Sequence, residues 1–157
     1  PSMMQQMIRV PGLDGNKMGK SEGDNTIDIN SPIPVIRDRY LKKGVTDVER
    51  KRASDTGDPY SRCQSVYSVH ELVTNGEVET RTIANACRTA QIGCSECKHH
   101  LVDNIAKILE PFQSARAELS EKDDYVKEII HDGGRKARGM VLETVVTVRD
   151  KMGIIIY

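Results

Sequence analysis

Two lysines, Lys17 and Lys20, lie in a short polar loop and are the side chains of this chain best suited to chemistry. No helix or strand period runs through the loop, and it contains four glycines that permit turns other residues resist, namely Gly12, Gly15, Gly19 and Gly23. Two ammonium groups on such a loop suit a polyphosphate, where charge shifts between oxygens during transfer. A solvated basic loop is the simpler alternative for so short a pattern.

The ending Gly19-Lys20-Ser21 also occurs in Walker A loops, which place another glycine five residues before the last one. Position 14 is Asp, and it would put a carboxylate where backbone N–H groups should hold phosphate. Residues 22–30 are polar and form no amphipathic helix after the loop. The sequence therefore argues against a Walker-type nucleotidase.

Four cysteines are the second group that could do chemistry: Cys63, Cys87, Cys94 and Cys97. The last two form a C-x2-C pair, in which the helix start favours thiolates that can share one metal. Two more thiolates would complete a four-sulfur site for zinc or an iron–sulfur cluster. Free buried thiols are the alternative, and disulfides are disfavoured because nothing in the sequence suggests secretion. Spacing alone does not choose between the metals.

Composition limits the class of protein. The 157 residues fit one domain, and 23 Lys and Arg balance 23 Asp and Glu, so any RNA contact must come from a local patch. With one Phe, five Tyr and no Trp, the core must rely on aliphatic residues and Met. No run of about 18 apolar residues is present, so we expect no membrane span and a cytoplasmic protein.

The spacing of apolar residues predicts a series of helices. They cover about residues 31–43, 62–73, 77–90, 94–119, 123–132 and 135–152. Gly44 should end the first helix, Pro111 should kink the longest one, and Gly133-Gly134 should separate the last two. Several valines make strand an alternative for the last segment. The segment between residues 46 and 60 reads as an ordered loop.

The segment Lys17-Met18-Gly19-Lys20-Ser21 and its flanks, Val10-Pro11-Gly12-Leu13-Asp14-Gly15 and Glu22-Gly23, carry a resemblance to a known family. They resemble the Lys-Met-Ser-Lys-Ser motif of class I aminoacyl-tRNA synthetases, in the form found in tryptophanyl-tRNA synthetases. Gly19 stands where that family has Ser. The resemblance implies that Lys17, Met18, Gly19, Lys20 and Ser21 bind ATP with Mg, and that Lys17 and Lys20 stabilise the pyrophosphate leaving group.

The cysteines extend the resemblance. A subset of tryptophanyl-tRNA synthetases holds a 4Fe–4S cluster beside its anticodon-binding surface with the same last two cysteine spacings, and a first spacing one residue shorter. By this likeness Cys63, Cys87, Cys94 and Cys97 are cluster ligands, with zinc as the alternative. Lys98, next to the last cysteine, and Arg116, where the family has an arginine pair, are then tRNA-binding residues.

The likeness covers about residues 8–153 and implies a mainly α fold, a helical bundle that follows the last loop of a Rossmann-type catalytic domain. Residues 1–30 would end the catalytic domain, and residues 31–157 would form the anticodon-binding domain with its four-cysteine metal site.

The implied protein is a tryptophan–tRNA ligase that uses ATP, tryptophan and tRNA(Trp) and forms a homodimer through its catalytic half. A His-Ile-Gly-His type motif is absent, so we expect a part of a longer chain with no activity by itself. The alternative is a non-catalytic, metal-stapled helical RNA-binding module.

Overall fold

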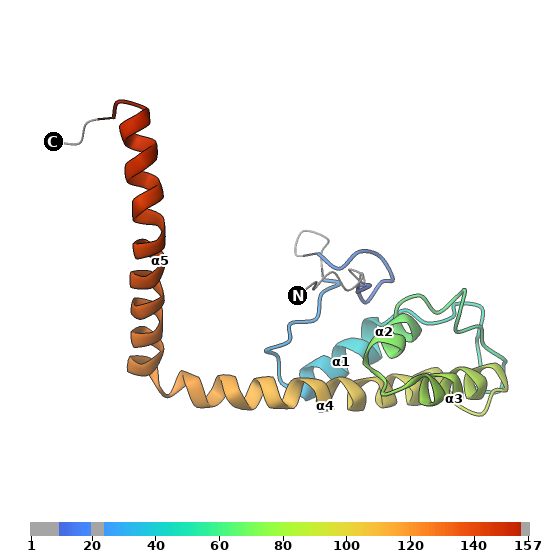
Figure 1. Ribbon diagram of the computed structural model, residues 1–157. Helices are drawn as coiled ribbons and strands as arrows, with labels where there is room; N and C mark the ends of the chain where they lie inside the picture. The colour runs from blue at the N-terminus through green and yellow to red at the C-terminus, as the bar shows by residue number, and fades with distance from the viewer. Residues whose placement is uncertain (1–9, 20–23, 155–157) are drawn as a thin grey trace. The chain divides into compact units, whose positions relative to one another are not determined.

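The computed structural model describes residues 10–19 and 24–154, and within them the protein is helical (Figure 1). The five helices are α1 (Ile33–Lys43), α2 (Val66–Val73), α3 (Glu77–Arg88), α4 (Cys94–Ser120) and α5 (Asp123–Lys151). Among these residues the extended backbone is limited to one isolated antiparallel bridge between Pro11 and Lys17. The predicted mainly α fold is confirmed. No described helix is both long enough and apolar enough to cross a membrane.

The chain divides into two compact units, Pro1–Phe112 and Gln113–Tyr157. The core of the first unit draws on the loop before α1 and on α1 to α4, and its largest fully buried apolar side chains are Leu13, Ile36, Val66, Leu101 and Val102. The second unit contains the last turns of α4 and all of α5, and α5 buries none of its side chains. The predicted boundary at residue 30 stays a prediction.

Helix α1 ends at the predicted residue and begins at Ile33, two residues after the predicted start. Pro32 occupies the N-cap and Pro34 lies in the first turn, where a missing N–H costs little. At the other end the Gly44 N–H donates a hydrogen bond of 3.0 Å to the Tyr40 carbonyl. A Cβ atom at Gly44 would lie 2.7 Å from that carbonyl oxygen, so glycine is required to stop the helix this closely.

Two predicted boundaries were wrong. Helix α2 begins at Val66 rather than near residue 62, because Asp58 accepts the N–H groups of Tyr60 and Ser61 at 3.1 Å each and holds that stretch in a turn. Helix α5 runs unbroken through Gly133-Gly134. Neither glycine adopts a positive φ, and a glycine with helical dihedrals weakens a helix by about 1 kcal/mol without ending it.

The segment between α1 and α2 is an ordered loop, as predicted. Its centre is the buried carboxylate of Asp47, which accepts the N–H groups of Glu49 at 3.0 Å and Asp58 at 2.8 Å. Arg62 Nε lies 3.4 Å from the same carboxylate. These contacts tie the two ends of the loop together, because Asp47 and Asp58 are eleven residues apart.

Candidate functional site

The lysine loop is organised around Asn25, whose side chain is 5% exposed. Its Nδ2 donates to the Lys17 carbonyl at 3.0 Å and to Asp14 Oδ1 at 3.1 Å. Its Oδ1 accepts the Gly19 N–H at 3.4 Å. One amide therefore fixes the backbone on both sides of Met18. A Cβ atom at Gly12 would lie 2.7 Å from Asn25 Nδ2, so glycine is needed there for the loop to close.

Asp14 has a structural role in the same loop. Besides Asn25 it binds Asn16, through the Asn16 backbone N–H at 3.0 Å and side-chain amide at 3.1 Å. The hydrogen bond from the Asn16 side chain is the main reason that the pKa of Asp14 is lowered, so the carboxylate stays charged. A charged carboxylate at this position fits the sequence argument against a phosphate-cradling Walker A loop.

The loop is anchored to the helical core by Leu13 and Ser65. The Leu13 side chain is 2% exposed, and its carbonyl accepts the Val45 N–H at 2.8 Å. The buried Ser65 hydroxyl, at the start of α2, lies 2.9 Å from the Gly12 carbonyl and 3.0 Å from the Leu13 carbonyl. The base of the loop is therefore fixed to the elements that follow it.

Three of the predicted ATP-binding residues, Lys17, Met18 and Gly19, are described by the structure and lie in this loop. Lys17 is exposed, and its ammonium group forms no ion pair within the described ranges. Met18 and Gly19 line a hollow of about 600 Å³ together with residues of the 26–30 segment. Lys20 and Ser21 lie outside the described residues.

The four cysteines, distant in sequence, come together in the first unit. All six pairs of their thiols are close enough to interact electrostatically. Burial is the main reason that the pKa is raised to about 11 for Cys63 and to about 12 for Cys97. Burial likewise raises the pKa of Cys87. The thiols of Cys63, Cys87 and Cys97 thus lie in low-dielectric surroundings that disfavour uncompensated thiolates.

The thiol of Cys87 is closely approached by Arg50 and by the backbone of Gly57. Arg50 Nη1 lies 3.7 Å from Cys87 Sγ, while its Nη2 donates to the carbonyls of Ala53 at 2.6 Å and Ile92 at 2.8 Å. A Cβ atom at Gly57 would lie 2.6 Å from the same sulfur, so only glycine fits there. The loop between α1 and α2 is therefore built closely around the thiol.

Cys97 is held by the buried His70. The ring Nε2 lies 3.1 Å from the Cys97 carbonyl and 3.4 Å from its sulfur, and Nδ1 lies 3.1 Å from Thr74 Oγ1. Burial lowers the pKa of His70, so the ring is neutral. A neutral ring with Nε2–H donating to the carbonyl and Nδ1 accepting the Thr74 hydroxyl satisfies both nitrogens.

The donor chemistry of this site suits a metal that prefers sulfur, but the side chains do not form a finished coordination sphere. Across residues 10–19 and 24–154 no group of three or more His, Cys, Asp or Glu side chains is arranged to hold a metal ion. Four thiols converging beside a guanidinium group are the right ligands for zinc or an iron–sulfur cluster. The predicted ligand set stays a prediction.

The two predicted tRNA-binding residues have different surroundings. Lys98 is partly buried and its ammonium group donates to the Leu41 carbonyl at 3.3 Å. Burial lowers its pKa, against the opposing influence of the nearby thiols. Arg116 is exposed on α4. The structure therefore leaves the Arg116 side chain open to solvent and gives Lys98 an internal partner.

Sequence reasoning missed the residues that position these groups. Asn25, Ser65 and Arg50 carry no motif, and each acts through backbone carbonyls that only the fold brings near. Gly57 carried a weak signal, since a glycine in a charged loop can mark a close approach.

Comparison with known proteins identifies the family. The model of class I tRNA synthetases (W and Y) matches residues 1–110. The chain belongs to this family. It is 38% identical over 152 residues to the tryptophan–tRNA ligase of Deinococcus radiodurans, which covers 96% of this chain and 44% of the relative. It is 32% identical over 153 residues to that of Thermotoga maritima, covering 98% of this chain and 45% of the relative.

Solved structures with a similar fold belong to the same family. Tryptophanyl-tRNA synthetase from Campylobacter jejuni, crystallised with ADP and tryptophan, superposes with a TM-score of 0.83 at 26% identity. The superposition covers 96% of this chain and 45% of that one. The enzyme from Aeropyrum pernix gives a TM-score of 0.58 at 32% identity over 67% of this chain and 29% of that one. The chain spans less than half the length of these relatives.

Proposed function

We propose that this chain is part of a tryptophan–tRNA ligase, which activates tryptophan with ATP and transfers it to tRNA(Trp). The observation that carries the proposal is its similarity to proteins of that name along nearly its whole length, with 96% of the chain aligned to the Deinococcus relative. The lysine loop falls within the part matched by the family model. As in the family it resembles, the intact protein would act as a homodimer.

In this proposal the loop holds the phosphates of ATP, with Mg, while pyrophosphate leaves. Lys17 and Lys20 each offer a positive charge and three N–H donors to phosphate oxygens. Charge-assisted contacts of this kind contribute about 1.5–3 kcal/mol each. Asn25 supports the loop by fixing the backbone at Lys17 and Gly19. Gly19 in place of the family's Ser removes one hydroxyl from the loop.

The test is ATP–pyrophosphate exchange by the full-length protein with Lys17→Ala or Lys20→Ala. Loss of one such contact in the transition state should slow exchange about 10- to 100-fold. Lys42→Ala is the matched control, since Lys42 is exposed on α1 and forms its ion pair with Asp38, one turn earlier on the same helix. Exchange at the control rate in both loop variants would remove the catalytic role. Binding of tRNA(Trp) without any exchange would instead favour a non-catalytic RNA-binding module.

We further propose that Cys63, Cys87, Cys94 and Cys97 hold a 4Fe–4S cluster, with zinc as the alternative. Support comes from the family likeness of their spacing and from the mutual proximity of the four thiols. A metal or cluster bound by these thiolates would link α3, α4 and the loop before α2 through its coordination bonds. Arg50 beside Cys87 would offset part of the negative charge of the thiolates.

We propose that the helical part binds tRNA(Trp), with Lys98, next to Cys97 in the sequence, and Arg116 as separate contacts. Arg116 is the more accessible of the two, because Lys98 already donates to the Leu41 carbonyl. If Arg116 binds a phosphate, Arg116→Ala should reduce the salt slope of tRNA binding by about one unit. Arg135→Ala on α5 is the control. An unchanged slope would exclude this contact.

A further inference from the structure

An apolar cavity of about 270 Å³ lies between the lysine loop and the helical core of the first unit. The segment before α1 contributes Val10, Met18 and Ile27 to its walls, and the core contributes side chains of α1, α2 and α4. Apart from Met18 and the ring of Tyr40, the named lining residues are aliphatic. The cavity therefore favours an apolar side chain and disfavours a polar one.

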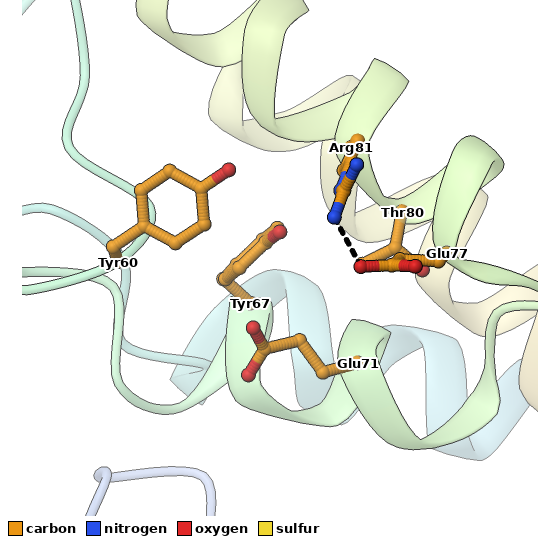
Figure 2. Close-up of a pocket in the computed structure, with 6 residues that line it drawn as sticks. All are labelled: Tyr60, Tyr67, Glu71, Glu77, Thr80 and Arg81. Carbon is orange, nitrogen blue, oxygen red and sulfur yellow. Dashed lines mark hydrogen bonds and ion pairs between the residues drawn. The ribbon is translucent and has the colours of Figure 1, made fainter.

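Helix α2 separates this apolar cavity from a more polar one of about 410 Å³ (Figure 2). Tyr67 and Glu71, one turn apart on α2, line the polar cavity, which adjoins the cysteine site because the Tyr67 N–H donates to the Cys63 carbonyl at 3.2 Å. Val73 lines the apolar cavity, and residues two apart on a helix lie about 200° apart around its axis. Of these two cavities, the apolar one is lined by residues of the lysine loop.

The backbone of the loop directs the Met18 side chain inward. Lys17 forms the antiparallel bridge with Pro11, and successive side chains of an extended backbone point to opposite sides. Lys17 is exposed and Met18 is half-buried, in agreement with this alternation. Asn25 fixes the backbone on both sides of Met18, through the Lys17 carbonyl at 3.0 Å and the Gly19 N–H at 3.4 Å.

Met18 belongs to a wall between two hollow spaces. Together with Ile27 and Ile29 it lines both the apolar cavity and the hollow of about 600 Å³ beside Gly19. Ile27 packs against the hydrophobic core, which fixes that part of the wall. A methionine side chain has three rotatable bonds and adapts to irregular apolar space. Because consecutive Cα atoms are about 3.8 Å apart, a shift of Met18 also moves Lys17.

We propose that Met18 is a positioning residue: the apolar cavity holds its side chain, and this contact sets where the neighbouring Lys17 ammonium group meets phosphate. The proposal rests on the proposed function and adds to it a contact between the lysine loop and the helices. The Met18 side chain then serves the loop rather than ATP itself. Side chains on the helical side of the cavity, such as Val73, would influence the reaction without touching ATP.

The test measures ATP–pyrophosphate exchange by the full-length protein. Met18→Gln keeps the length of the side chain but replaces the thioether by an amide that the apolar cavity disfavours, so kcat should fall about tenfold. The KM for tryptophan should stay within about twofold, because the loop acts on the phosphates of ATP. Met18→Leu has an apolar side chain of similar volume and should retain most of the activity.

A second variant tests the helical side of the cavity. Val73→Ala should slow exchange about threefold, and the double variant Met18→Gln/Val73→Ala should be no slower than Met18→Gln alone, because both changes act through one contact. Val78→Ala is the matched control, since it makes the same chemical change at a position of α3 that is 81% exposed. Thermal melting of each variant establishes that it is folded at the assay temperature.

The outcomes separate the two proposals. If wild-type protein catalyses exchange and Met18→Gln is as fast as Val78→Ala, the cavity proposal is overturned and the proposed function stands. An equal loss in Met18→Gln and Met18→Leu would also overturn it, because leucine is apolar. Additive losses in the double variant would show that Val73 does not act through Met18. If wild-type protein catalyses no exchange, the proposed function fails, and the cavity proposal fails with it.

Discussion

The side-chain amide of Asn25 donates a hydrogen bond of 3.0 Å to the backbone carbonyl of Lys17, eight residues earlier. The same amide group accepts the Gly19 N–H and donates to Asp14. Asn25 therefore positions the backbone of Lys17, although its own side chain takes no part in the proposed reaction. The lysine side chain is free to reach a phosphate while its backbone is held, which is the preorganisation that electrostatic catalysis needs.

We predict that Asn25→Ala slows ATP–pyrophosphate exchange by the full-length protein about tenfold or more. The substitution removes all three contacts and leaves the Lys17 carbonyl without its donor, so the loop samples many conformations. Stability should fall by about 1–3 kcal/mol, the usual cost of unsatisfied buried groups. Denaturant unfolding and exchange kinetics measure the two effects.

Asn75→Ala is the matched control for this prediction, because Asn75 is exposed in the turn between α2 and α3. The same chemical change there should alter neither quantity. If Asn25→Ala kept full exchange activity, the loop would not depend on this amide for its working geometry.

A second prediction concerns Arg50. Its guanidinium group joins the carbonyls of Ala53 and Ile92, and Arg50→Ala leaves both without this donor. We expect a loss of about 2–3 kcal/mol in unfolding free energy, as for other charge-assisted hydrogen bonds. Arg52→Ala, two residues away and exposed, should change stability by less than about 0.5 kcal/mol. Equal melting curves for the two variants would contradict the role assigned to Arg50.

The metal proposal predicts that anaerobically purified protein is brown and contains iron and acid-labile sulfide. Four thiolates with no other charged ligand suit an iron–sulfur cluster as well as zinc, so colour and elemental analysis together decide. Cys97→Ser should lower the bound metal and the thermal stability together, because ligand loss and folding are linked. Colourless protein with stoichiometric zinc would rule out the cluster. Metal-free wild-type protein would rule out both.

The sequence predicted the helices well and their junctions less well. Helix α3 begins at Glu77 as expected, because Asn75-Gly76 ends the preceding helix and two acidic residues favour a new start. The break at Gly133-Gly134 was wrong, since a glycine ends a helix only when its backbone leaves helical dihedrals, which sequence alone does not reveal. The late start of α2 came from Asp58, a local side-chain contact that competes with the helix.

In the candidate site too, the sequence predicted some residues and missed others. Residues that could perform chemistry, Lys17 and the four cysteines, stand out by type and spacing. Those that position them do not, because Asn25 and Arg50 act on carbonyls whose proximity depends on tertiary structure.

The last prediction concerns alkaline pH and Tyr40, a residue of α1 that is 3% exposed and belongs to the core. Burial raises the pKa of Tyr40 from 10.0 to about 12. The folded state thus holds the phenol proton more tightly than the unfolded state. This contribution to stability is fully present below pH 10 and is lost as the pH rises from 10 to about 12. Two pKa units correspond to about 2.7 kcal/mol.

Tyr40→Phe removes the titrating group and keeps the ring, so it should change stability little at neutral pH. Above pH 10 the variant should lose less stability than the wild type, by up to about 2–3 kcal/mol near pH 12. Denaturant unfolding at intervals of pH measures the difference, and Tyr125→Phe, at an exposed tyrosine of α5, is the control. Parallel pH profiles for wild type and Tyr40→Phe would mean that Tyr40 ionises in the folded protein as easily as in the unfolded chain.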